Sequence, residues 1–167
     1  MADFKNNVQK LVSNLDSVDE NYDERNTFTD FIRPLFEELG WNFQSDVKLE
    51  RYDNSEANAF EIDGVTRFYL KEFPLSSSME SLKDEITSTV SYAYNKGVTW
   101  VIATNFKEMR VYNTESTGRT LASMQHYSFL ASEYIKKFEN LSDLTKKQFS
   151  LNVLDSDAEY FGKKPKR

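Results

Sequence analysis

The side chains that could perform chemistry in this sequence are carboxylates, lysines and hydroxyls. The 167 residues include no cysteine and a single histidine, His126. The lack of cysteine excludes disulfides, thiol nucleophiles and cysteine-ligated metals. A single histidine argues against a multi-histidine metal site and a conventional Ser-His-Asp triad, and His126 has no partner motif beside it. Catalysis would therefore depend on carboxylates, lysines, hydroxyls or a metal ion held by oxygen ligands.

One pair of carboxylates has a spacing that suits a metal ion. Glu61 and Asp63 are two residues apart, so on a strand they would point to the same face. Asp63 is also followed by Gly64, and an Asp-Gly dipeptide is typical of a tight turn, where aspartate is favoured for backbone reasons. The residues alone leave both interpretations open.

The net charge limits the ways in which the chain could bind nucleic acid. The 21 Lys and Arg against 27 Asp and Glu give a net charge of −6, which excludes binding through bulk positive charge. A local basic patch stays possible, and scattered surface charge is the alternative. The candidate phosphate contacts, at predicted strand ends and loops, are Arg67, Lys96, Lys107, Arg110 and Arg119.

The composition is that of a globular protein with one domain. Hydrophobic residues are 39% and aromatic residues 14% of the chain. A chain of this length can bury a hydrophobic core without disulfides or bound metal ions to stabilise it. No apolar run approaches the ~20 residues that a membrane span needs. The first residues lack the apolar stretch of a signal peptide. We therefore expect a cytoplasmic protein with no membrane partner.

Apolar residues at helical spacing predict the helices. In the second of them, Pro34 should kink the helix or mark an internal restart, and Gly40 should end it. A last short helix should be capped by Ser142 and carry Leu144 and Phe149. The other predicted helices are 4–15, 26–39, 79–95 and 127–138.

Alternating apolar residues predict the strands, two of which should form a hairpin across Asp63-Gly64. The run 99–104 is the most apolar in the chain and is typical of a central buried strand. The other predicted strands are 46–51, 59–62, 67–73 and 109–113. The order of elements predicts an α/β fold with a mixed central sheet flanked by helices.

An ordered series of segments extends through residues 22–150. It begins with Phe-Ile-Arg-Pro-Leu-Phe-Glu-Glu-Leu-Gly-Trp at 31–41 and continues through 60–70, 92–94, 101–106, 110–113 and 116–119. The series resembles the N-terminal nuclease domain of type IIG restriction–modification enzymes and, more loosely, the N-terminal domain of type I restriction subunits. The resemblance implies a restriction-endonuclease-like, PD-(D/E)XK fold over residues 1–150. It also implies that 151–167 begin a connector to a further domain, which in this family is an adenine-specific DNA methyltransferase.

The resemblance also implies a particular site. In the family an Asp and a Glu hold Mg²⁺ through oxygen ligands, and a Lys two residues after the Glu helps to activate water and stabilise phosphate charge. Here the four family positions are replaced. The resemblance places Ala57 at the position of the metal-binding Asp, Lys71 at that of the Glu and Phe73 at that of the Lys. Ser88 occupies the position of a glutamine that the family carries on the following helix.

Neighbouring carboxylates offer displaced ligands for an active site. Glu72 would need a register slip, which the buried pattern of the strand resists, and Glu56 would need a bulge. Glu61 and Asp63 complete the candidates. Lys71 in the old cleft could contact DNA phosphate or could be a strand-end lysine that reaches solvent.

The resemblance and the replaced positions together predict a nuclease-type domain of a DNA restriction–modification or phage-defence protein. We expect it to be catalytically inactive and to act as a DNA-binding or interaction module. Its expected partners are DNA and the methyltransferase or specificity domains of a longer protein or complex. The alternative is an active Mg²⁺-dependent DNA endonuclease with a rearranged carboxylate site. We expect no cofactor unless the domain is active, in which case Mg²⁺ is required.

Overall fold

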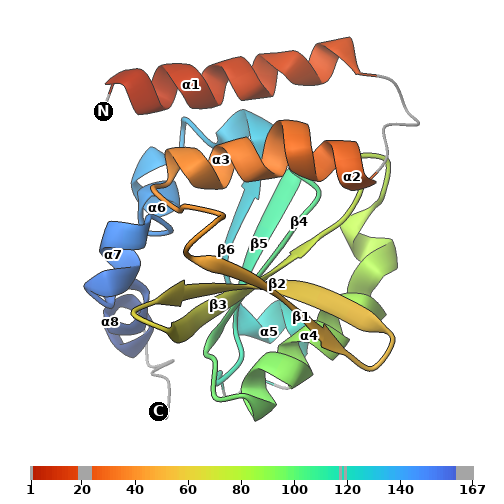
Figure 1. Cartoon of the computed structure of the whole chain (residues 1–167), viewed down its shortest axis with the longest axis vertical. Coiled ribbons are helices and arrows are strands. Elements are labelled where there is room, and N and C mark those ends of the chain that lie inside the picture. Colours follow the sequence, from red (N-terminus) through yellow and green to blue (C-terminus); the bar gives the residue numbers. More distant parts are fainter. Residues whose placement is uncertain (1, 19–23, 117, 119, 161–167) are drawn as a thin grey trace.

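The computed structural model describes residues 2–18, 24–116, 118 and 120–160. Within them, strands form one mixed sheet in the order β1-β2-β3-β4-β5-β6 (Figure 1). Strands β3 and β4 pair in parallel, and the other neighbours pair antiparallel. The strands are β1 (Val47–Tyr52), β2 (Ser55–Ile62), β3 (Val65–Glu72), β4 (Trp100–Thr104), β5 (Glu108–Asn113) and β6 (Gln125–Leu130). The predicted mixed α/β sheet is confirmed; its restriction-endonuclease-like character stays a prediction.

The helices lie on both faces of this sheet. Figure 1 shows α3 over one face with α1 outside it, and α4 packs against the other face. The helices are α1 (Ala2–Ser13), α2 (Glu24–Thr27), α3 (Arg33–Glu38), α4 (Lys83–Asn95), α5 (Leu121–Met124), α6 (Phe138–Ser142), α7 (Lys146–Ser150) and α8 (Val153–Tyr160). Helix α4 is also the crossover that the parallel pair β3 and β4 requires.

The hairpin between β2 and β3 has the predicted turn. Asp63 and Gly64 both have positive φ, 53° and 79°, as a two-residue turn that follows the strand twist demands. Both strands are longer than predicted, because β2 begins at Ser55 and β3 begins at Val65.

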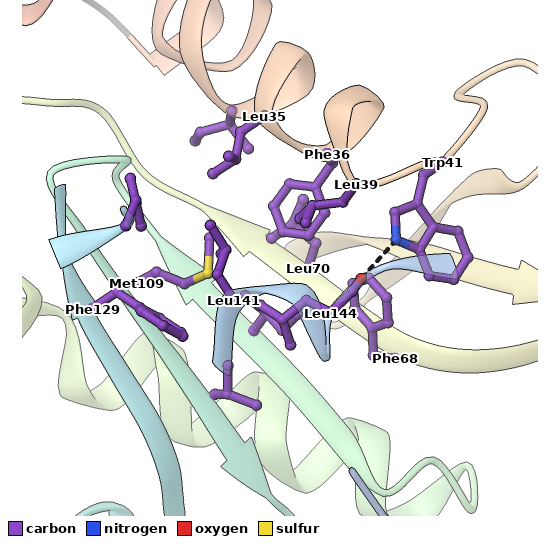
Figure 2. Close-up of a cluster of buried hydrophobic side chains, with 14 of the residues drawn as sticks. Leu35, Phe36, Leu39, Trp41, Phe68, Leu70, Met109, Phe129, Leu141 and Leu144 are labelled. Atoms are coloured by element: carbon purple, nitrogen blue, oxygen red, sulfur yellow. Dashed lines mark hydrogen bonds between the residues drawn. The ribbon is translucent and has the colours of Figure 1, made fainter. Parts of the chain in front are cut away.

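Alternation along β3 divides the core into two clusters. Phe68 and Leu70 pack with Phe36 and Trp41 on the α3 side, whereas Tyr69 and Phe73 pack on the α4 side. Figure 2 shows the α3-side cluster. There the Trp41 Nε1 donates a hydrogen bond of 3.0 Å to the carbonyl oxygen of Leu144. This contact ties the end of the α3 segment to the C-terminal helices.

The predicted helix at 127–138 is wrong. Residues 125–130 form strand β6, in which Tyr127 and Phe129 pair with Val111 and Met109 of β5. Alternation places Phe129 in the core and leaves the Leu130 residue 51% exposed. The aromatic side chains fit a half-buried sheet surface, and pairing with β5 outweighs the weak helical pattern.

Three smaller differences concern helix ends and loops. The predicted helix 26–39 is interrupted by a π-helical turn at Phe28–Ile32, and α3 restarts beside Pro34, as one of the two predicted outcomes stated. Thr145, not Ser142, caps the helix that carries Phe149, because its hydroxyl accepts from the Gln148 amide at 3.2 Å. Helix α5 lies where no helix was predicted.

Helix α8 packs onto the same core. Leu154 and Ala158 are buried in the α3-side cluster, and the Trp100 Nε1 donates to Asp155 Oδ1 at 2.7 Å. Residues 161–167 lie outside the described residues. A connector function for 151–167 stays a prediction.

No helix in the described part of the chain is long and apolar enough to cross a membrane.

The Asp46 carboxylate links the segment before β1 to α7. Asp46 accepts hydrogen bonds from the Asn42 amide at 2.9 Å and from Lys146 Nζ at 3.0 Å. Burial opposes ionisation of Asp46, but the Asn42 amide and the Lys146 ammonium outweigh it, so the pKa of Asp46 lies below its ordinary value. The folded state therefore gains stability from this group above the unfolded pKa and loses it as the pH falls through the folded value.

We predict that Asp46→Asn lowers the free energy of unfolding by about 1–2 kcal/mol near neutral pH. The difference from wild type should shrink below about pH 4, where the wild-type carboxylate also takes up a proton. Urea unfolding followed by circular dichroism at several pH values measures it. Glu37→Gln, in an exposed pair with Arg33, should have little effect, and a pH-independent loss in Asp46→Asn would contradict the prediction.

Candidate functional site

Two of the four positions that the resemblance singles out, Ala57 and Lys71, lie in a lateral row on the face of the sheet covered by α4. Glu50 of β1 pairs with Ala57 of β2. One step beyond the Asn58–Leu70 pair, the register brings Ala57 beside Lys71. Lys71 pairs with Ala103 of β4. We call Glu50, Ala57, Lys71 and Ala103 the Lys71 row.

Lys71 is buried in this row and its ammonium group is bound by neutral oxygens. The residue is 9% exposed. Its Nζ donates to the Ser55 hydroxyl at 2.9 Å and to the Glu56 carbonyl oxygen at 2.8 Å, and it lies 5.8 Å from the centre of the Phe73 ring. Among the described residues no carboxylate forms an ion pair with it. The small Ala57 and Ala103 leave room for its methylene stem.

The other replaced positions are mainly apolar. Ala57 and Phe73 are both buried in the cluster that packs against α4. Ser88 is half-buried on α4 itself. The three sheet positions that the resemblance assigns to the metal site and its lysine therefore carry a methyl group, an ammonium group and a phenyl ring.

Glu50 is a member of the row that the sequence analysis missed. Its Oε1 accepts hydrogen bonds from the Tyr69 hydroxyl at 3.0 Å and the Tyr92 hydroxyl at 2.7 Å. Tyr52 stacks on Tyr92 with ring centres 4.2 Å apart, and its hydroxyl lies 2.6 Å from Thr89 Oγ1. The sequence contained a signal that could have identified Glu50. Alternation along the predicted strand places Glu50 and Tyr52 on the face opposite Val47 and Leu49.

The tyrosines around Glu50 are held in the protonated form. Burial, followed by the hydrogen bond to Glu50, raises the pKa of Tyr92 to about 12. The same causes, in the same order, raise the pKa of Tyr69 well above its ordinary value. Both hydroxyls are therefore hydrogen-bond donors at neutral pH, and Glu50 is already engaged by protein groups.

The carboxylates considered as displaced metal ligands point in different directions. Glu72 faces away from Lys71, as alternation predicts, and accepts from Asn58 Nδ2 at 2.7 Å. Glu56 is exposed beside Arg51 at 3.6 Å, and Glu61 pairs with Lys48 at 3.4 Å. Asp63 is exposed in its turn. Within the described ranges, no three Asp, Glu or His residues gather as a metal ion would require.

His126 is engaged by structural neighbours. Its Nε2 lies 2.7 Å from Asp157 Oδ2, and its ring packs edge-on against Trp100. It thus links β6 to α8.

The structure spreads the candidate phosphate contacts over the molecule. Lys96 follows α4 and lies over the Tyr92 ring, whereas Lys107 is exposed at the opposite end of β4. Arg67 donates to the Asn152 side chain. Arg110 is bound to Glu108 Oε2 at 2.7 Å and Glu80 Oε1 at 3.1 Å. Arg119 lies outside the described residues.

Searches against protein-family models, curated proteins and solved structures each gave no match. The resemblance to restriction–modification nuclease domains therefore stays a prediction from the order of motifs in the sequence.

We predict that Glu50→Gln lowers the pKa of Tyr92 from about 12, because removal of the carboxylate charge makes the phenolate less unfavourable. The value should stay above that of an exposed tyrosine, since burial is the larger cause. Spectrophotometric titration of the tyrosines, with Tyr92→Phe to assign the transition, measures it. Glu61→Gln, which removes a carboxylate paired with Lys48, is the matched control, and an unchanged titration in Glu50→Gln would refute the prediction.

Proposed function

We propose that this chain is a nuclease-type domain of a restriction–modification or phage-defence protein that does not cleave DNA and serves as an interaction module. The element order supports the proposal: helices precede a three-stranded antiparallel unit, followed by a crossover helix and a parallel strand. The resemblance of the motif series over residues 22–150 is the reason for proposing this family. The proposed partner is the methyltransferase or specificity part of the same protein or complex.

The proposal that the domain does not cleave DNA depends on one observation, the burial of the Lys71 ammonium group. It stands at the position where the family has a metal-binding Glu, with Ala57 beside it in place of the metal-binding Asp. A divalent cation about 4 Å from a lysine charge would be repelled by roughly 8 kcal/mol at an effective dielectric constant near 20. Two carboxylates would be needed to reverse this, and Glu72 points to the other face.

The distribution of cations favours interaction with protein over a grip on DNA. Arg110 is engaged by two carboxylates, and Lys71 is buried. Lys96 and Lys107 are exposed but lie at opposite ends of β4. A non-specific DNA site needs several cations along one surface, and the net charge of −6 opposes it.

We predict that Ala57→Asp, Lys71→Glu and Phe73→Lys together create a site that binds Mn²⁺, since they restore an Asp and a Glu-x-Lys pair on one face. Isothermal titration calorimetry should detect Mn²⁺ with the triple variant and not with wild type or Lys71→Glu alone. Failure of a folded triple variant to bind Mn²⁺ would mean that the row does not correspond to the family site.

Cleavage by the wild-type chain would overturn the proposal directly. Mg²⁺-dependent nicking of plasmid DNA that is lost in Glu72→Ala would establish the active alternative with displaced carboxylates. The proposal expects no nicking by either protein.

DNA binding is tested separately, by fluorescence anisotropy of a labelled duplex at several salt concentrations. The proposal expects no salt-sensitive binding by the wild-type chain. Salt-sensitive binding that weakens in the double variant Lys96→Glu with Lys107→Glu, and not in the charge-matched control Lys10→Glu with Lys136→Glu, would favour the DNA-binding form of the domain.

A further inference from the structure

A cavity of about 420 Å³ lies between the start of α4, strand β5 and α5. It is two strands away from Lys71 and contains none of the positions discussed as metal ligands. Its volume suits a small organic molecule. The lining side chains that bear on the argument are Glu80, Lys83, Arg110, Tyr112, Leu121 and Ala122.

Tyr112 gives this cavity a hydrogen-bonding group without a partner. The residue is 1% exposed, and its hydroxyl is the buried side-chain polar atom that finds no hydrogen-bond partner among the described residues. Burial is the main cause that raises the pKa of Tyr112, and the Arg110 guanidinium, which approaches the hydroxyl oxygen as a donor, opposes it. Because a guanidinium cannot accept a hydrogen bond, the hydroxyl proton stays available for donation. Buried polar groups in native proteins nearly always have a partner, and a ligand oxygen would supply one.

Two carboxylates hold the positive groups beside the cavity: Glu80, which lines it, and Glu108, whose Oε2 accepts from Arg110 Nε at 2.7 Å. Arg110, with a side chain that is 15% exposed, donates from Nη2 to Glu80 Oε1 at 3.1 Å. Lys83 Nζ contacts Glu80 Oε2 at 2.9 Å. The Glu80 side chain is 64% exposed, so it can leave these contacts for solvent without crossing the core. The Glu80 carboxylate thus occupies the position between Arg110 and Lys83 that the anionic group of a ligand would take.

We propose that this cavity binds a small molecule that carries a phosphate group. The phosphate oxygens replace the Glu80 carboxylate on Arg110 and Lys83 and accept a hydrogen bond from the Tyr112 hydroxyl. A dianion suits the site better than a single carboxylate because two cations face it once Glu80 has moved away. The remaining space, bordered by Leu121 and Ala122, accommodates the organic part of the molecule.

The first test uses the wild-type chain with inorganic phosphate, adenosine 5′-monophosphate and adenosine as probes. Isothermal titration calorimetry should detect the two phosphate-bearing probes at millimolar concentration and not adenosine. Tighter binding of the nucleotide than of inorganic phosphate identifies the organic part as a contributor. No binding of either phosphate probe would overturn the proposal.

Two substitutions then locate the binding. Tyr112→Phe should weaken phosphate binding about tenfold to a hundredfold, the effect of one hydrogen bond to a charged group, and should leave the thermal midpoint without ligand unchanged. Glu80→Gln should strengthen binding severalfold because it removes the competing carboxylate. The matched controls are Tyr94→Phe and Glu85→Gln, which remove the same groups from α4 outside the cavity lining.

The two variants separate a ligand site from a merely structural tyrosine. If Tyr112→Phe lowers the thermal midpoint and leaves phosphate affinity unchanged, the hydroxyl serves the fold through water and the proposal fails. If Glu80→Gln weakens binding, the carboxylate is not a competitor and the proposal fails as well. Because Glu80 is exposed, this second variant keeps the test decisive even if Tyr112→Phe proves unstable.

Discussion

Strand β3 is buried on both faces, and its two-residue period decides what each face of the sheet carries. Phe68 and Leu70 complete the α3-side core, so Tyr69, Lys71 and Phe73 must face α4. A slip of one residue would bring Glu72 to the α4 side but would also turn two large apolar side chains out of their cluster. The register of the core therefore keeps the carboxylate and the ammonium on opposite faces.

The α4 face is mainly apolar, and within the described structure the two charged groups of the Lys71 row are both engaged by protein atoms. Lys71 is bound by a hydroxyl and a carbonyl oxygen, and Glu50 by two tyrosine hydroxyls. Each buried polar group thus recovers the hydrogen bonds that it loses with water. Such an arrangement stabilises one folded state.

The same face has a different character beyond β4. There Arg110 and Tyr112 stand two residues apart on β5 and share the α4 side. The hydroxyl of Tyr112 lacks a partner in the described structure, in contrast to the satisfied groups around Lys71. If the sheet retains a ligand site, the contrast places it at β5 and α5, away from the position implied by the family resemblance.

The amino-acid sequence by itself determined the sheet class, the Asp63-Gly64 turn and the facing of Lys71 against Glu72, because turn chemistry and two-residue alternation are local properties. It did not determine that residues 125–130 pair with β5, since their aromatic pattern is ambiguous until a neighbouring strand is present. The contacts of Glu50 with Tyr69 and Tyr92 join residues 19 and 42 positions apart, and the cavity at Tyr112 is bordered by three separate segments. Only the tertiary structure decides such features, because they arise where distant segments pack against one another.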